Sequence, residues 1–338
     1  MLNYYKCIDE SIWTGRIDSL TEYDAFRWHQ CVKPLDLNLD NEIFKGKLGF
    51  AFIGFCCDEG VRLNKGRIGA AKGPLSIRKA LVNLPCRFNQ RVKLFDAGNI
   101  YYEKDTDLID CQNALAFAVQ KIKNLNLFPI ILGGGHETTL GNFMGNLNYL
   151  KDNSNNPSLG IINFDAHFDL RPYPNGGTSG TMFRQISDIC ASTSIDYGYL
   201  CLGIQEHSNT LNLFRTADEL GAEYVLAKNM TGIDEDYWTI LDKIDNFLAF
   251  NENIYITICS DVFSSGFAPG VSATQPLGLS PEICLKLLKH ILKSKKVISF
   301  DISEVAPRFD SDNNTSNLAG AIIFTLIKTL TKLYDLYL

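Results

Sequence analysis

Residues 160–172, GIINFDAHFDLRP, form an apolar run that stops abruptly at a cluster of charged side chains. Residues 160–164 predict a buried strand, because short β-branched and aromatic runs bounded by turn residues suit the interior of a parallel sheet. Asp165, His167 and Asp169 follow this strand directly. Ligands of open α/β sheets collect in the crevice outside the carboxyl ends of the strands. A D-A-H-x-D cluster at that position therefore predicts a metal site.

Strand and helix patterns alternate along the rest of the chain. This alternation predicts an α/β fold with a parallel sheet of about eight strands and right-handed crossovers, in one domain over residues 1–338. Residues 1–45 read as an irregular or partly helical lead-in, and 151–157 and 311–317 as loops. The other expected strands are 49–55, 92–95, 128–132, 197–202, 223–226, 254–258 and 297–300. The expected helices are 73–81, 108–122, one from about 138, 210–220, 237–250, 281–292 and 319–336.

Composition narrows the class of protein. A chain of 338 residues that is 46% hydrophobic can bury a sizeable core. Its net charge of -6, with no Lys/Arg cluster, disfavours nucleic acid and anionic membranes as partners and leaves a small molecule. The ten cysteines lack zinc-type spacing, Met1 begins a polar segment unlike a signal peptide, and no apolar stretch has the length of a membrane span. Reduced thiols in the cytoplasm are expected.

Two further strands end in candidate ligands. The strand 128–132 runs into three glycines, His136 and Glu137, and the strand 254–258 runs into Cys259, Ser260 and Asp261. A phosphate-binding loop is the competing interpretation of the glycines, but the P-loop and dinucleotide patterns are absent. A single histidine or carboxylate at a strand end is more often structural. Three such motifs at one sheet edge favour a metal centre.

The joint pattern resembles the ureohydrolase superfamily of arginases, agmatinases and formimidoylglutamases. GGGHE, NFDAHFD and SDVF…APGVSA carry the resemblance, and the loop 54–73 is similar to the formimidoylglutamase form, as are SGTMFRQ, SNT and EVAP. The resemblance implies a three-layer α/β/α fold, two Mn²⁺ ions per subunit and a homo-oligomer. It also implies hydrolysis of N-formimidoyl-L-glutamate to L-glutamate and formamide, a step of histidine degradation.

The resemblance assigns roles to particular residues. One ion would be bound by His136, Asp165 and Asp169, and the other by Asp165, His167 and Asp261, with Asp165 bridging. A hydroxide held by the two ions would attack the formimidoyl carbon. Asp169 would then move a proton to the departing amine, and Glu304 would orient the cationic amidine.

The implied substrate carries two carboxylates, so cationic side chains are expected at the mouth of the site. Arginine's planar fork matches a carboxylate. The expected rim residues are Arg67, Arg171 and Arg184, in loops that should line this mouth. Asn64, Ser179, Thr181 and Asn209 are weaker polar contacts, and each of these residues has a structural role as its alternative.

Cys259 departs from the superfamily pattern, in which this position is a bridging aspartate. A thiolate is softer than a carboxylate and matches Mn²⁺ poorly, so the second ion is expected to bind weakly or to need reducing conditions. Cys56 or Cys57, with Cys57 favoured, is a candidate redox partner of Cys259; two inert buried thiols are the alternative. Phe183 occupies about the position of the proton-shuttling histidine of arginases, which disfavours that activity.

Two other functions stay open. An agmatinase-like or other guanidino or amidino hydrolase would share the metal site. A cationic substrate tail would require acidic side chains at the positions where Arg67 and Arg184 are expected. A metal-poor pseudoenzyme that acts as a scaffold is conceivable because of Cys259. Metal content and the identity of the hydrolysed substrate distinguish the three.

Overall fold

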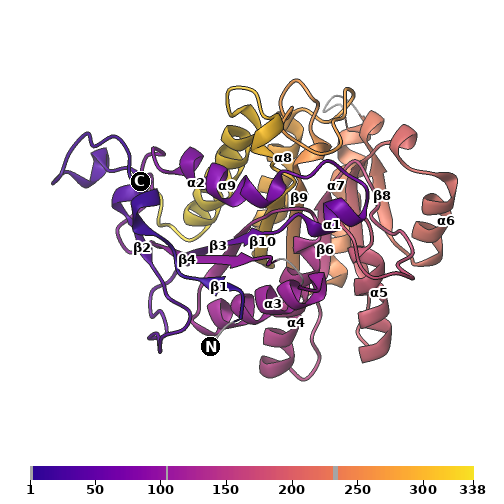
Figure 1. The fold of residues 1–338 in the computed structure, drawn as a ribbon, viewed down its shortest axis with the longest axis horizontal. Helices are drawn as coiled ribbons and strands as arrows, with labels where there is room; N and C mark the ends of the chain where they lie inside the picture. The colour runs from indigo at the N-terminus through magenta and orange to yellow at the C-terminus, as the bar shows by residue number, and fades with distance from the viewer. Residues whose placement is uncertain (1–2, 104–105, 231–234) are drawn as a thin grey trace.

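The computed structural model describes residues 3–103, 106–230 and 235–338, so Met1 and the start of its polar segment lie outside the described residues. A ten-stranded sheet runs through the middle of the molecule (Figure 1). Its strands are β1 (Tyr5–Lys6), β2 (Val32–Pro34), β3 (Gly49–Cys56), β4 (Lys93–Tyr101), β5 (Phe128–Leu132), β6 (Gly160–Phe164), β7 (Gly198–Ile204), β8 (Glu223–Leu226), β9 (Ile254–Cys259) and β10 (Val297–Ser303).

The strand order is β1-β4-β3-β5-β10-β9-β6-β7-β8, and β2 pairs with β4. Only β1 with β4 is antiparallel among the described strand pairs. Strands β5, β6 and β9 are almost entirely buried, which explains their continuous apolar sequences, because a parallel strand is covered on both faces.

Helices cover both faces of the sheet and make the three-layer α/β/α arrangement that was expected (Figure 1). One face carries α2 (Gly73–Leu81), α7 (Glu235–Phe250), α8 (Pro281–Lys293) and α9 (Asn314–Leu333). The other carries α3 (Leu108–Asn124), α4 (Thr138–Asn153), α5 (Met182–Thr193) and α6 (Leu211–Glu219). Helix α8 illustrates why: six of its apolar residues recur at helical spacing and are buried, and Pro281 occupies its first turn.

Some local predictions were wrong. The lead-in supplies two short strands, β1 and β2, that its polar sequence did not reveal. Helix α5 lies where the sequence suggested a loop, α9 begins inside the expected loop 311–317, and α4 extends to Asn153. Tertiary packing overrides weak local patterns here: Trp13 and Trp28 of the lead-in both stack on Phe52 of β3.

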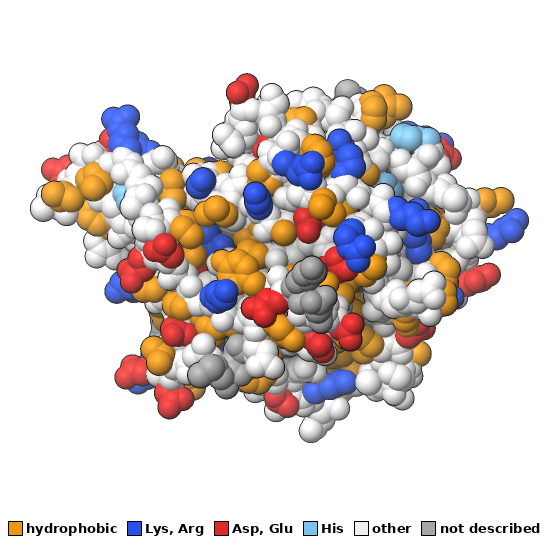
Figure 2. All heavy atoms as spheres, in the orientation of Figure 1, with side chains coloured by type: hydrophobic (Ala, Val, Ile, Leu, Met, Phe, Trp, Pro, Cys, Tyr) orange, Lys and Arg blue, Asp and Glu red, His pale blue; other side chains and the backbone are white. Residues whose placement is uncertain are grey.

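The surface and the helices also bear on partners. On the face drawn in Figure 2, basic and acidic side chains are interspersed. Within the described part of the chain, none of the helices combines the length and apolarity that a bilayer crossing requires.

The central strands β5, β10, β9 and β6 are consecutive neighbours, and their carboxyl ends are in register. Ile302 of β10 pairs with Leu132 of β5, Ser303 pairs with Cys259 of β9, and Ile258 pairs with Phe164 of β6. The segments that follow these strands therefore begin along one line at one edge of the sheet. This register brings together motifs that are far apart in the sequence.

A buried ion pair joins the lead-in, α2 and β4. Arg78 and Asp96 are at most 1% exposed, and the Arg78 Nε and Nη2 atoms lie 2.7 and 2.8 Å from the two Asp96 carboxylate oxygens. Arg78 also donates to Asn99 Oδ1 and to the Gly98 carbonyl, while Trp13 Nε1 donates to Asp96. The guanidinium of Arg78 and both carboxylate oxygens of Asp96 thus gain partners on another segment.

The buried acid Glu137 fastens helix α1 (Glu59–Leu63) against the glycine loop after β5. Its Oε1 accepts hydrogen bonds from Gly60 N at 2.8 Å and from Cys57 Sγ at 3.8 Å. A Cβ on Gly60 or Gly135 would lie 2.5 or 2.0 Å from Glu137 atoms, so only glycine leaves room for this side chain. Burial, reinforced by the charge of Asp58, raises the pKa of Glu137 to about 7.

Replacing Arg78 with alanine should strongly destabilise the fold. The substitution leaves the Asp96 carboxylate buried without its counter-charge, which costs about 4 kcal/mol in such sites. Urea unfolding should show this loss, whereas Lys228→Ala, which breaks the exposed pair with Glu206, should leave the midpoint unchanged. Equal midpoints for the two variants would contradict the structural role of the buried pair.

Glu137→Gln should change how stability depends on pH. Because the folded pKa of Glu137 is about 7 against an ordinary 4.5, its stabilising contribution is full below pH 4.5 and is lost as the pH rises through 7. Glutamine mimics the protonated acid and escapes that loss. Relative to the wild type, its free energy of unfolding should increase by about 3 kcal/mol between roughly pH 5 and pH 8.

Urea unfolding of chelator-treated protein at both pH values measures this difference. The exposed Glu252→Gln is the matched control and should follow the wild type at both pH values. Parallel pH profiles for Glu137→Gln and the wild type would show that the buried carboxyl is not the titrating group.

Candidate functional site

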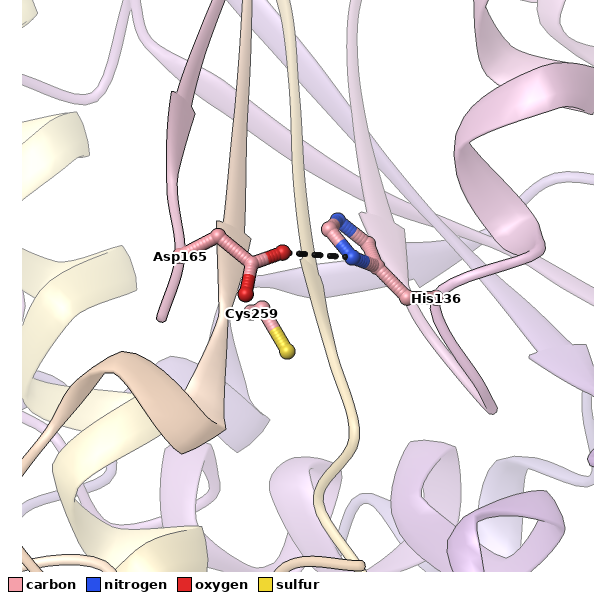
Figure 3. Close-up of side chains that lie close together, drawn as sticks. All are labelled: His136, Asp165 and Cys259. Atoms are coloured by element: carbon pink, nitrogen blue, oxygen red, sulfur yellow. Dashed lines mark ion pairs between the residues drawn. The ribbon is translucent and has the colours of Figure 1, made fainter. Parts of the chain in front are cut away.

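Two groups of candidate metal ligands share Asp165 at the carboxyl edge of the sheet. His136, Asp165 and Cys259 form the first group, and Asp165, His167 and Asp261 form the second; within each, the ligand atoms lie within 4.8 Å of one another. Figure 3 shows His136, Asp165 and Cys259 approaching one another from separate segments, with Asp165 Oδ2 3.0 Å from His136 Nδ1. His167 Nδ1 lies 3.4 Å from Asp165 Oδ1 and 3.3 Å from Asp261 Oδ2.

Asp169 extends the first group. Its Oδ2 lies 3.1 Å from His136 Nδ1. Asp169 has a left-handed φ of 50°, which turns the chain sharply at the end of the D-A-H-x-D segment. Between the polar residues, Ala166 and Phe168 are fully buried. The alternation aims the polar side chains at the crevice and the apolar ones at the core.

Local hydrogen bonds orient the shared carboxylate. Asp165 Oδ1 accepts from the His167 backbone N at 2.8 Å, and Asp165 Oδ2 accepts from Asn163 Nδ2 at 3.2 Å. Asn209 holds the same segment from outside: its Oδ1 accepts from Phe168 N, and its Nδ2 donates to the carbonyls of Ala166 and Gln205. The side chains therefore need little rearrangement to meet a ligand.

The site concentrates buried negative charge. Burial alone would lower the pKa of His136, but Asp165 and Asp169 outweigh it and raise that pKa well above its ordinary value. His167 behaves in the same way: burial lowers its pKa, but Asp261 and Asp165 outweigh this effect and raise the pKa well above its ordinary value. Burial, followed by the repulsion of Asp165, raises the pKa of Asp169 to about 6. An arrangement that draws protons onto its histidines is one that attracts cations.

A hydrogen-bonded chain behind His136 selects its tautomer. Thr257 Oγ1 donates to Asp301 Oδ1 at 2.7 Å, so it has no hydrogen left for His136 Nε2, which lies 3.0 Å away. Nε2–H of His136 must then donate to Thr257. In the neutral ring this leaves the Nδ1 lone pair facing Asp165 and Asp169, as a metal ligand requires.

Glu304 follows β10 and turns into the same crevice with a left-handed φ of 64°. Its Oε1 accepts from the His136 backbone N at 2.9 Å, and its Oε2 has no hydrogen-bond partner among the described residues. Burial, with repulsion from Glu137 and Asp261, raises its pKa well above the ordinary value. A buried carboxylate with one free oxygen is suited to a cationic group.

These side chains border a cavity of about 200 Å³. Most of the residues expected from the sequence line it, and Asp165 lies fully buried close to its floor. The lining residues are Val61, Asn64, Gly66, His136, His167, Asp169, Arg171, Ser179, Asn209, Leu213, Cys259, Asp261, Ser272, Ala273 and Glu304.

Of the three expected rim arginines, Arg171 lines the cavity and the other two do not. Arg67 donates through Nε and Nη2 to the carbonyls of Ser272 and Val271 and lies over the ring of Phe309. Arg184 lies on helix α5, not in a loop as predicted. The unpredicted helix thus carries Arg184 away from the mouth.

Thr181 also lies outside the lining, because its hydroxyl bonds within its own turn to Thr178 and Gln185. Phe183 makes an edge contact with the ring of His136 and stacks on Tyr199, so it shields one side of the site with apolar surface.

Three polar residues at the site were not predicted from the sequence. Thr257 and Asp301 lie inside β9 and β10, where buried polar residues are hard to distinguish from the apolar pattern. Gln275 places Nε2 3.5 Å from His167 Nε2 and accepts from Ser208 Oγ. Thr257 alone had a usable signal, since it precedes Cys259 by two positions and strand side chains at that spacing share a face.

The two cysteines of the hypothesised redox pair are both free thiols. Cys57 donates to Glu137, and burial, with repulsion from Asp165 and Asp261, raises the pKa of Cys259 well above its ordinary value. Their pairing stays a prediction.

The donor set suits divalent cations that prefer oxygen and imidazole ligands, such as Mn²⁺. Asp261 Oδ1 is buried without a hydrogen-bond partner among the described residues, as is the free oxygen of Glu304. An orphaned carboxylate oxygen inside a ligand group is what a missing cation would leave behind. The residues therefore fit a divalent-cation site built around Asp165.

Comparisons with known proteins agree with this architecture. The model of the arginase family matches residues 48–328. A curated formimidoylglutamase of Clostridium tetani (strain Massachusetts / E88) is 58% identical over 99% of this chain and 98% of its own. The crystal structure of a formimidoylglutamase from Bacillus subtilis superposes with a TM-score of 0.77 at 23% identity, over 93% and 94% of the two chains. A Trypanosoma cruzi formiminoglutamase solved with Mn²⁺ gives 0.73 at 22% identity, over 86% and 97%.

The family match covers most of the chain, from just before β3 into α9, and contains every candidate ligand. The chain belongs to the arginase family.

Proposed function

We propose that the chain is a hydrolase that converts N-formimidoyl-L-glutamate and water to L-glutamate and formamide. The observation that carries this proposal is the position of Glu304, whose free carboxylate oxygen opens on the same cavity as two ligand groups joined by Asp165. The high identity to curated formimidoylglutamases supports the choice of substrate.

Two Mn²⁺ ions would be held by His136, Asp165 and Asp169, with Cys259 beside them, and by Asp165, His167 and Asp261. Bound there, they would supply Lewis-acid polarisation and lower the pKa of a water molecule. The number of ions is part of the proposal, since Cys259 replaces an oxygen donor with a softer sulfur.

The protein side chains would bind the amidine and move its protons. Glu304 Oε2 would accept a hydrogen bond from the amidinium, fixing the formimidoyl carbon over the ligand groups. As a water oxygen adds to this carbon, Asp169 would accept a proton and pass it to the glutamate nitrogen. The bond from carbon to that nitrogen then breaks, releasing formamide and the amine. Asp169 lines the cavity beside His136, which suits a carboxylate that carries a proton between the water and the departing amine.

The substrate carboxylates would meet Arg171 and the hydroxyl of Ser179, both of which line the cavity. No hydrogen bond or ion pair of the Arg171 guanidinium occurs within the described residues, so it can bind an anion without breaking an existing contact. The same cation would repel the ammonium tail of agmatine. We place the reaction in the cytoplasm, in a homo-oligomer, by analogy with the resembling family.

A substrate panel tests the function. The reduced, Mn²⁺-loaded protein should release formamide and glutamate from N-formimidoyl-L-glutamate, and should leave L-arginine and agmatine intact. Glu304→Gln retains the acceptor for His136 N but loses the charge, so its kcat/KM should fall about 100-fold. Urea from arginine or agmatine would overturn the substrate assignment, and metal binding without any turnover would indicate a pseudoenzyme.

Thr257→Val should weaken metal binding because it removes the acceptor that orients His136. Loss of such an outer contact typically lowers metal affinity about 10- to 100-fold. Mn²⁺ titration followed by electron paramagnetic resonance of the free ion measures this directly. Thr331→Val is the control, since Thr331 is equally buried but bonds only to the Lys328 carbonyl. Unchanged affinity in Thr257→Val would contradict the orienting role of the hydroxyl.

A further inference from the structure

Two cysteines outside the candidate site have their sulfur atoms in contact. The Sγ atoms of Cys31 and Cys86 lie 3.0 Å apart, and both are free thiols. Cys31 belongs to the lead-in, and Cys86 follows helix α2. The two residues are far apart in the sequence, so their contact is a product of the tertiary structure.

The backbone around the pair is held in place by antiparallel pairing. Trp28 N donates to the Leu84 carbonyl at 2.9 Å, and Cys86 N donates to the Phe26 carbonyl at 2.9 Å. The fully buried Trp28 adds a hydrogen bond from its indole Nε1 to the Pro85 carbonyl. These hydrogen bonds hold the backbone segments of the two cysteines side by side. A disulfide, with sulfurs about 2 Å apart, would need only a small approach.

The two thiols differ in a way that suits oxidation. Cys31 is partly exposed, whereas Cys86 is buried, so an oxidant from solvent reaches Cys31 first. The hydrogen bond from Cys86 lowers the pKa of Cys31 against the effect of burial, with help from Tyr23 and from the charge of Lys93. The same hydrogen bond, with burial, raises the pKa of Cys86. The more accessible thiol thus has the lower pKa of the two, the usual order of an attacking and a resolving thiol.

We propose that Cys31 and Cys86 form a reversible dithiol–disulfide site that reacts with hydrogen peroxide and is separate from the candidate metal centre. The Cys31 thiolate attacks one peroxide oxygen and breaks the O–O bond, which leaves a sulfenic acid on Cys31 and releases hydroxide. The Cys86 sulfur then attacks the Cys31 sulfur, its proton leaves with the departing hydroxyl as water, and the S–S bond forms. Two thiols and one peroxide thus yield one disulfide and two waters.

The disulfide would tie the lead-in to the body of the fold. It closes a loop that contains β3, α1 and α2, and so restricts the unfolded chain more than the folded one. A loop of this length should raise the melting temperature by about 5 °C. Because neither cysteine lines the catalytic cavity, this effect does not depend on the proposed function.

Peptide mapping of the full-length protein tests the proposal. The reduced chain is treated with equimolar hydrogen peroxide, quenched with catalase, alkylated and digested without reductant. We expect a cross-linked peptide that joins Cys31 to Cys86 and disappears with dithiothreitol, together with the higher melting temperature. Cys7 is an exposed thiol and reports whether the oxidant has acted.

Variants assign the effect to the pair. Cys31→Ser and Cys86→Ser should each lose the cross-link and the thermal shift, while Cys7→Ser should keep both. Oxidised Cys7 beside freely alkylated Cys31 and Cys86 would overturn the proposal, as would a Cys31 that oxidises without forming the cross-link. A cross-link without a rise in melting temperature would contradict the claim that the disulfide stabilises the fold by linking the lead-in to it. The map of the wild-type chain decides the chemistry even if a serine variant folds poorly.

Discussion

A buried carboxylate in the middle of the sheet organises the surroundings of the site. Asp301 of β10 is fully buried and accepts hydrogen bonds from Asn142 of α4 and from Tyr255 and Thr257 of β9. An unpaired charge at this depth would cost far more than an ordinary hydrogen bond returns, so all three donors must stay in place. Satisfying Asp301 therefore fixes α4 against two central strands and, through Thr257, fixes the ring of His136.

The arrangement of the two ligand groups also reflects the free-energy cost of burying charged side chains. Asp165, Asp169 and Asp261 are carboxylates collected in a largely buried crevice, and the two histidines partly compensate them. Hydrogen bonds from backbone and amide groups hold Asp165 between both histidines. Cys259 adds a thiol, not a further carboxylate, to this crowded centre. The proposed affinity for a divalent cation therefore depends on the protonation and redox state of one sulfur.

The mouth of the cavity is positioned by contacts outside it. Glu137 holds α1, which carries Val61 and leads to Asn64, and Asn209 holds the segment of His167 and Asp169. The lead-in stabilises the opposite end of the sheet through Trp13, Trp28 and the Arg78–Asp96 pair. Residues outside the cavity thus decide where several of its lining residues lie.

The sequence by itself determined the layered α/β architecture and the strand ends that carry His136, Asp165 and Asp261, because buried strands and the polar turns after them are local patterns. It also singled out Cys259 and Glu304. Only the tertiary structure decided that β5, β10, β9 and β6 are neighbours in register, that Thr257 and Asp301 lie behind His136, that Arg171 alone of the three arginines lines the cavity, and that Cys31 meets Cys86. Strand order, side-chain direction and long-range contacts depend on how distant segments pack, and no local pattern encodes them.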